Sequence, residues 1–321
     1  MFNSLKQCLT RTSARTASTV TTLGGALVIL VGGALSSANA QTDYSAINAD
    51  PALWSISDED STVYLFGTVH LLPPNLDWQT AKISAAFDAS ETVYFEADAL
   101  SAESQATMQQ LIPVLGLNAP GVTLSSLISD EAKAHVATIA ARLGAPADAF
   151  AAQLDPLQPW LASLQMAVLQ IQASGYDPTS GVETVLSAQV AEAGKTAAYF
   201  ETVEQQLRFL SDSPIELQVA NFELGVADMV ENPEMLTELI QAWAVGDMEY
   251  LDQLFNEEMR ETTPELYDRI IFQRNANWIP QIEAALAGSG DVFVAVGAGH
   301  MPGERGVIGL LEAEGYTVVR E

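Results

Sequence analysis

Short apolar runs at both ends of the chain predict β-strands. Residues 52–57 (ALWSIS) and 62–69 (TVYLFGTV) lie on either side of the turn sequence DEDS and predict a hairpin. Further strands are expected at 92–98, at 291–297 and in the final YTVVRE, 316–321. The run VFVAVG is apolar throughout, which is typical of a strand buried on both faces of a sheet. Helices are therefore expected to cover a parallel or mixed sheet.

The middle of the chain has a different pattern. From about residue 100 to 287 the sequence is rich in Ala, Leu and Gln with helical spacing, and Gly/Pro clusters such as GAPAD, LDPLQPW and GYDPTSG interrupt it. One short strand is expected at 195–200, and helices also at 77–90 and 304–314. The pattern predicts an α/β or α+β fold: one domain over residues 41–321, whose middle, about 100–287, is a mainly helical subdomain or lid.

The first 40 residues have the pattern of a secretory signal peptide. Three basic residues precede an apolar run at 23–35, and the small residues of Ala-Asn-Ala, 38–40, offer a cleavage site after Ala40. The apolar run is too short for an ordinary transmembrane helix. We expect an exported protein, periplasmic or secreted, and an uncleaved anchor is the alternative.

Charge and cysteine content exclude several classes of function. The chain has 13 Lys and Arg against 41 Asp and Glu, a net charge of −28. Such a surface repels nucleic acid and anionic lipid, so neither is an expected partner. No later run is long enough to span a membrane after cleavage of the signal. The single cysteine, Cys8, lies in the predicted signal, which excludes thiol nucleophiles and thiolate metal sites from the mature protein.

Two similar motifs contain two of the three histidines. GTVHLLPP begins at Gly67 and GAGHMPGE begins at Gly297, which aligns His70 with His300. Each motif follows an apolar run, and ligands in α/β proteins collect where strands end at their carboxyl edge. Glycine there allows unusual backbone angles or a close approach of a ligand. We expect both imidazoles at one edge of the sheet; the alternative is that each histidine merely caps its loop.

A carboxylate is expected at the same edge. Glu96 ends the predicted strand in YFEAD, and two imidazoles with one carboxylate are a frequent ligand set for a catalytic divalent ion such as Mn, Zn or Co. Such an ion activates water for amide or ester hydrolysis. Glu183, Glu201 or Asp98 would then be a fourth ligand or the general base.

The order of these motifs resembles that of a known family. The chain contains YLFGTVHLLP, YFEAD, SGVETVL, GKTAAYFETVEQQL, RNANW and VGAGHMPGERGVIGLLEAEGY, and this series is similar to the TraB/GumN family (TraB/PrgY/GumN), which includes the Tiki metalloproteases. The resemblance implies a sheet flanked by helices and a metal-dependent peptidase site with His70, His300 and Glu96. It also draws attention to Arg274, Glu201 and Gln205.

Several roles stay open within this resemblance. Arg274 would bind a substrate carboxylate or stabilise an oxyanion, or else form a salt bridge with one of the many acids. Glu201 would act at the site or only favour the N-terminus of the next helix. Relatives often have Gly-Ile-Asp where this chain has Gly181-Val182-Glu183, and it lacks the C-terminal membrane anchor of Tiki proteins.

Three functions compete at this stage. The first is an exported metal-dependent hydrolase, a peptidase acting on a peptide or protein substrate. The second is a non-catalytic protein that binds peptides in a groove between the sheet and the helices. The third is a hydrolase without a cofactor, which would use His70 and Glu96 as acid and base. The sequence predicts no oligomeric state.

Overall fold

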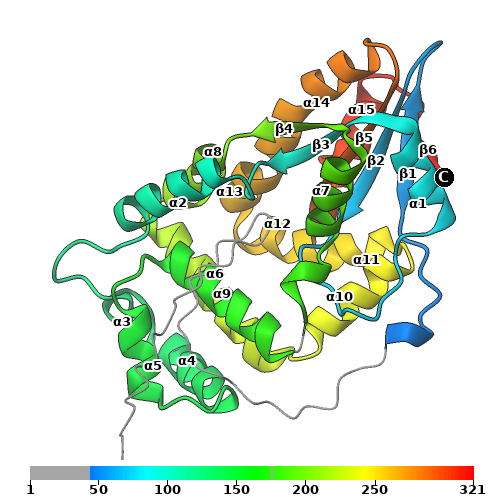
Figure 1. Cartoon of the computed structure of the whole chain (residues 1–321). Helices are drawn as coiled ribbons and strands as arrows, with labels where there is room; N and C mark the ends of the chain where they lie inside the picture. Colours follow the sequence, from blue (N-terminus) through cyan, green and yellow to red (C-terminus); the bar gives the residue numbers. More distant parts are fainter. Residues whose placement is uncertain (1–43, 175) are drawn as a thin grey trace, which may run out of the picture.

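A computed structural model describes residues 44–174 and 176–321 of the chain. The predicted signal peptide, residues 1–40, lies outside the described residues. Six strands of the described chain form one mixed sheet in the order β4-β3-β5-β2-β1-β6 (Figure 1). Their bounds are β1 (Leu53–Ser57), β2 (Thr62–Thr68), β3 (Ser90–Ala97), β4 (Thr196–Glu201), β5 (Asp291–Gly297) and β6 (Val319–Arg320).

The centre of the sheet joins the two ends of the chain. Strands β1 and β2 form the predicted hairpin, in which the Asp58 carboxylate accepts hydrogen bonds from the Ser61 backbone N–H at 3.0 Å and from the Ser61 hydroxyl at 2.8 Å. Strand β5, although late in the sequence, lies between β3 and β2 and is parallel to both. The carboxyl ends of β2, β3, β4 and β5 therefore meet at one edge.

Helices cover both faces of the sheet, because its central strands are apolar on both sides. On one face α14 (Gln273–Leu286) and α15 (Val307–Ala313) pack against side chains such as Leu65 and Val294. On the other face α1, α7 and α10 pack against Phe66 and Phe293. These three helices comprise Ala81–Ala89, Val182–Ala193 and Met235–Ala244. The sheet covered by helices confirms the predicted fold class.

The middle of the chain builds a second apolar cluster from helices alone. Its buried members include Met108, Val136, Phe150, Trp160 and Phe222. In Figure 1 this region lies beside and below the sheet. Its elements are α2 (Ala102–Leu115), α3 (Leu124–Leu127), α4 (Asp130–Arg142), α5 (Ala147–Leu154), α6 (Pro159–Ala173), α8 (Val203–Ser211) and α9 (Ile215–Glu231).

Short helices connect this region back to the sheet. They are α11 (Met248–Asp252), α12 (Glu258–Thr262) and α13 (Pro264–Tyr267), with the π-helical segments η3 (Gln253–Glu257) and η4 (Asp268–Phe272). The 3-10 turns are η1 (Tyr44–Ala46), η2 (Pro178–Ser180) and η5 (Ala298–His300).

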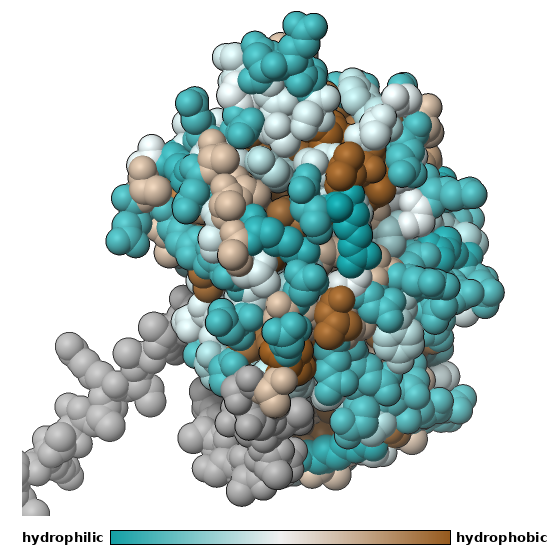
Figure 2. Space-filling view, turned by 90° about the vertical axis from the view of Figure 1, so that its right-hand side faces the viewer, coloured by the Kyte–Doolittle hydropathy of each residue, from teal (hydrophilic) through white to brown (hydrophobic). Residues whose placement is uncertain are grey.

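The outer surface is mainly polar on the face that Figure 2 presents, as the strong negative charge leads one to expect. Within the described chain, no helix combines the length and the apolar character that crossing a bilayer requires. The largest differences from the predicted elements are at helix starts and at the last strand. The helix expected at 77–90 begins only at Ala81, and the final strand is confined to Val319–Arg320.

Candidate functional site

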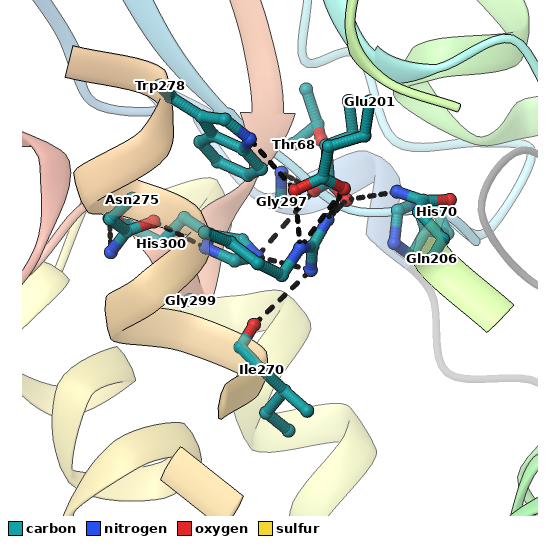
Figure 3. Close-up of polar contacts among 12 residues, drawn as sticks. Thr68, His70, Glu201, Gln206, Ile270, Asn275, Trp278, Gly297, Gly299 and His300 are labelled. Atoms are coloured by element: carbon teal, nitrogen blue, oxygen red, sulfur yellow. Dashed lines mark hydrogen bonds and ion pairs between the residues drawn. The ribbon is translucent and has the colours of Figure 1, made fainter. Parts of the chain in front are cut away.

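Side chains from four strand ends converge at the carboxyl edge of the sheet. His70 follows β2, Glu96 lies near the end of β3, Glu201 ends β4 and His300 closes the turn after β5. The two histidines, Glu96 and Arg274 line one cavity of about 310 Å³. Figure 3 shows Trp278 and Asn275 on one side of this group, with Gln206 and His70 on the other. The convergence arises because β2 and β5 are neighbouring parallel strands.

His300 is held at both of its ring nitrogens. Its side chain is buried, and Nδ1 lies 2.6 Å from Oδ1 of Asn275. The Asn275 amide nitrogen donates to the carbonyls of His300 and Arg305, which leaves Oδ1 as the acceptor and assigns the proton to Nδ1. Nε2 then accepts an N–H of Arg274 at 3.1 Å. Burial, followed by the Arg274 charge, lowers the pKa of His300 to about 3, so the ring is neutral.

Arg274 forms a buried ion-pair network with two carboxylates. It donates to Oε2 of Glu96 at 2.6 Å and to both oxygens of Glu201 at 2.9–3.1 Å. Trp278 Nε1 donates to the same Glu201 at 2.9 Å. Burial opposes the charge on Arg274, but the two carboxylates raise its pKa. The structure thus places Arg274 in salt bridges, one of the alternatives that the sequence left open, and occupies both oxygens of Glu201.

Glu96 is fixed from three sides. Its Oε1 accepts the Gly297 backbone N–H at 2.7 Å, and its Oε2 accepts from Gln206 at 3.0 Å as well as from Arg274. A Cβ on Gly297 would lie 3.0 Å from Oε1, so the glycine permits this close approach. Burial alone would raise the pKa of Glu96, but the Arg274 charge holds it well below its usual range. Glu96 is therefore a carboxylate at neutral pH.

His70 is paired with Glu183 at the N-terminus of α7. Its Nδ1 lies 2.7 Å from Oε1 of Glu183, an ion-pair contact that lacks the alignment of a good hydrogen bond. The Thr68 hydroxyl donates to the same oxygen. Burial lowers the pKa of His70, but the Glu183 charge outweighs it and raises the pKa to about 9. A Cβ on Gly181 would lie 1.9 Å from the His70 carbonyl oxygen, so only glycine lets α7 begin here.

Three other predicted residues have mainly structural contacts. A Cβ on Gly67 would lie 3.0 Å from the Cα of Ala298, so this glycine lets the second motif pack against the first. Gln205 accepts the Thr202 backbone N–H at 2.7 Å and forms the capping box of α8. Asp98 accepts backbone N–H groups of the turn that follows it.

Four residues of the site were not predicted: Thr68, Gln206, Asn275 and Trp278. Asn275 and Trp278 belong to the sequence RNANW at the start of α14. They follow Arg274 by one and four positions, lie on one side of the helix and contact the site together with it. That spacing on a predicted helix is the signal that could have found them.

The donor atoms bear on the expected divalent ion. Nε2 of His300 and Oε1 of Glu96 lie 3.9 Å apart, which two metal–ligand bonds of about 2.0–2.2 Å each can span. Nδ1 of His300 is hydrogen-bonded to Asn275, the usual second contact of a metal-binding histidine, and Nδ1 of His70 lies 2.7 Å from Glu183 without that alignment. Across residues 44–174 and 176–321, no three His, Cys, Asp or Glu side chains are grouped as a metal site, and Arg274 donates to Nε2. The donor types fit an ion; completing the site requires Arg274 to release Nε2 of His300, and a third ligand to approach. If that ligand is His70, whose pKa is raised, its ring must first lose a proton.

Comparison with known proteins gives one family. A model of the TraB/PrgY/gumN family matches residues 52–320, which covers every strand of the sheet and all the site residues described above. No curated protein matches the chain, and no solved structure does.

Proposed function

This chain belongs to the TraB/PrgY/gumN family, and from that premise we propose that it is an exported, metal-dependent hydrolase that cleaves peptide bonds. The observation that carries the proposal is the meeting of both G-x-x-H histidines with Glu96 in one cavity, although they lie far apart in the sequence. His300, Glu96 and His70 are the residues that would hold the ion. When bound, a divalent ion would polarise the scissile carbonyl and acidify a water molecule.

The protein's own groups have separable roles in this proposal. His300 offers a neutral Nε2, because Asn275 takes the proton on Nδ1. Arg274 and the Gly297 N–H keep Glu96 ionised and aligned. The positive charge of Arg274 would repel a divalent ion bound beside it. Glu201 offsets this charge, because both of its oxygens accept hydrogen bonds from the guanidinium.

Glu183 is the carboxylate that we assign to proton transfer. Its Oε1 is used by His70 and Thr68, whereas Oε2 is buried and has no hydrogen-bond partner in the part of the chain that the structure describes. Glu201 has no such oxygen. A general acid or base needs an available oxygen within reach of the proton that it moves, so Glu183 is better suited than Glu201.

The test combines metal analysis with peptide cleavage. Protein purified without a histidine tag is analysed for Mn, Zn and Co and then incubated with a fluorogenic peptide library, with and without a chelator. We expect turnover that the chelator abolishes and that one of these ions restores. His70→Ala, His300→Ala and Glu96→Gln should each abolish it, and His135→Ala, on α4 outside the cavity, should not. Turnover that persists in His70→Ala or His300→Ala would reject the assignment of the site.

A non-catalytic peptide-binding protein is the second candidate. The observation that favours it is the N–H of Arg274 on His300 Nε2, the nitrogen that a catalytic ion would need. This candidate predicts peptide affinity that survives both the chelator and the histidine substitutions, with no cleavage. Turnover that needs His70 and Glu96 but survives the chelator would instead indicate acid/base hydrolysis without a cofactor.

A further inference from the structure

A second, larger cavity adjoins the site. It has a volume of about 670 Å³ and lies between α7 and the β3–β4 end of the sheet. His70, Glu96 and Gln206 line both this cavity and the smaller one that contains His300. The two cavities are therefore adjacent, and a molecule in the larger one lies beside His70 and Glu96.

The larger cavity, which we call the groove, is open because of the sheet topology. Leu186 and Val190 of helix α7 belong to the same buried apolar cluster as Val93 and Phe95 of β3. Strand β4 is the last strand on that side of the sheet, and its residues Thr196, Ala197 and Tyr199 are exposed. A channel therefore remains between the helix and the strand. In Figure 1, α7 stands in front of the sheet beside β3.

The walls of the groove are apolar and partly exposed. Ala197 and Tyr199 of β4 share one side of the strand because side chains alternate along it. Opposite them stand Ala188 and Ala191 of α7, and Phe95 of β3 also lines the groove. Tyr199 is 40% exposed, which leaves part of its ring available to a ligand.

The charges of the groove lie mainly at its catalytic end. Lys195 is occupied elsewhere, because its ammonium donates to the carbonyls of Asp88 and Ser90 at 3.0 and 2.6 Å. The other charged side chains of the lining, apart from His70, are acidic: Glu96, Glu183 and Asp98. These carboxylates disfavour an acidic ligand.

We propose that this groove selects the substrate: it binds an extended, non-acidic peptide segment and buries one apolar side chain between α7 and β4, next to the bond at the catalytic groups. The proposal rests on the proposed function for its reaction, but the binding can be measured without it. Ala188 and Ala191 are then specificity-determining residues, because their small side chains leave the room that the substrate side chain fills. Burial of one Leu or Phe side chain corresponds to an affinity gain of about 10- to 100-fold.

The test fills the groove and measures binding separately from cleavage. The probes are eight-residue peptides of Gly, Ala and Ser, blocked at both ends and labelled with fluorescein, with Leu, Phe, Ser or Glu at one central position. Binding to the full chain is measured by fluorescence anisotropy in the presence of EDTA. Cleavage is measured with added Mn, Zn or Co. The variants are Ala188→Phe and Ala191→Phe, with Ala193→Phe as the matched control at an exposed position of α7 that does not line the groove.

We expect the Leu and Phe peptides to bind about 10- to 100-fold more tightly than the Glu peptide. Either groove variant should remove this preference while circular dichroism and the urea midpoint stay close to those of Ala193→Phe. Equal binding of all four peptides, absence of binding, or a preference that survives both groove variants would overturn the proposal. A preference in EDTA without cleavage under any ion would leave the groove standing and remove the proposed peptidase function.

Discussion

The two G-x-x-H motifs put their histidines into unlike surroundings. His300 is 5% exposed, and both of its ring nitrogens contact residues of one helix, α14. The His70 side chain is 37% exposed and is paired with Glu183, whose second oxygen is unused among the described residues. One half of the site is a closed network; the other half retains capacity for a ligand. Similar sequence motifs thus supply a fixed support and an accessible group.

The difference originates in the helix that each loop meets. The turn after β5 packs against α14, which presents Arg274, Asn275 and Trp278 to it. The loop after β2 meets the N-terminus of α7, where Gly181 allows backbone contact and Glu183 is the first acidic residue. A motif therefore predicts where a histidine lies, and its neighbours determine what the histidine can do.

The largest expected effect is on the free energy of unfolding, and it comes from the closed half of the site, the buried network around His300 and Arg274. Arg274→Met would leave Glu96 and Glu201 buried with their charge partner removed. We expect the free energy of unfolding to fall by roughly 3–5 kcal/mol, as for other broken buried ion pairs. Urea denaturation followed by circular dichroism measures it.

The matched control is Arg208→Met on α8, which breaks half-exposed pairs with Glu204 and Asp212. Its effect should stay within about 1 kcal/mol. Similar losses in the two variants would show that the Arg274 network is no more than a surface ion pair in energy, and the contrast between the two halves would fail.

A smaller effect concerns the acid side of the stability profile. The folded-state pKa of His300 is about 3, below the 6.5 of a free imidazole, so the unfolded chain binds a proton there first as the pH falls. The His300 contribution is complete above pH 6.5 and is lost at up to about 1.4 kcal/mol per pH unit below it. We expect a loss of about 2 kcal/mol between pH 6.5 and 5 from this group. The difference between the urea midpoints at pH 6.5 and pH 5 should become smaller in His300→Gln and should stay unchanged in His135→Gln.

The smallest effect is the pH dependence of stability that comes from His70, in the open half of the site. Its direction is opposite to that of His300, because stability is lost as the pH rises. The pKa of His70 is raised to about 9, so its stabilising contribution is complete below pH 6.5 and is lost as the pH rises through 9. The His70 side chain is 37% exposed, so solvent screens its charge, and we expect less than about 1 kcal/mol between pH 7 and 9.5. In His70→Gln, the free energy of unfolding measured by urea denaturation should change less over this pH range than in the wild type. A slope in the wild type as steep as the one expected for His300 would contradict the difference between the halves.

Much of the fold could be predicted because its signals are local. The hairpin, the strand at 195–200 and the apolar strand at 291–297 all follow from residue patterns over a few positions. The order of the strands was not predictable in this way. Placing β5 between β3 and β2 depends on packing between distant segments, which no local pattern encodes.

The candidate site was predicted less completely, and Gln205 shows why. The sequence Thr202-x-x-Gln205 has the spacing of a capping box, and the structure uses Gln205 in that way, while the next residue, Gln206, reaches Glu96. The capping pattern in the sequence therefore indicated a structural role for Gln205, not a role in the site. Asn275 was missed because a buried amide within a helical pattern has no signal until its partner, His300, is known.

The late position of β5 in the sequence has a consequence during synthesis. Until a ribosome has translated residues 291–297, β3 has no strand between it and β2, and the second histidine motif does not yet exist. Folding of the sheet must wait for this long-range pairing, which is characteristic of slow steps. A chain that stops before residue 300 therefore has no assembled site, and any activity of this protein begins only after β5 and the second motif have been made.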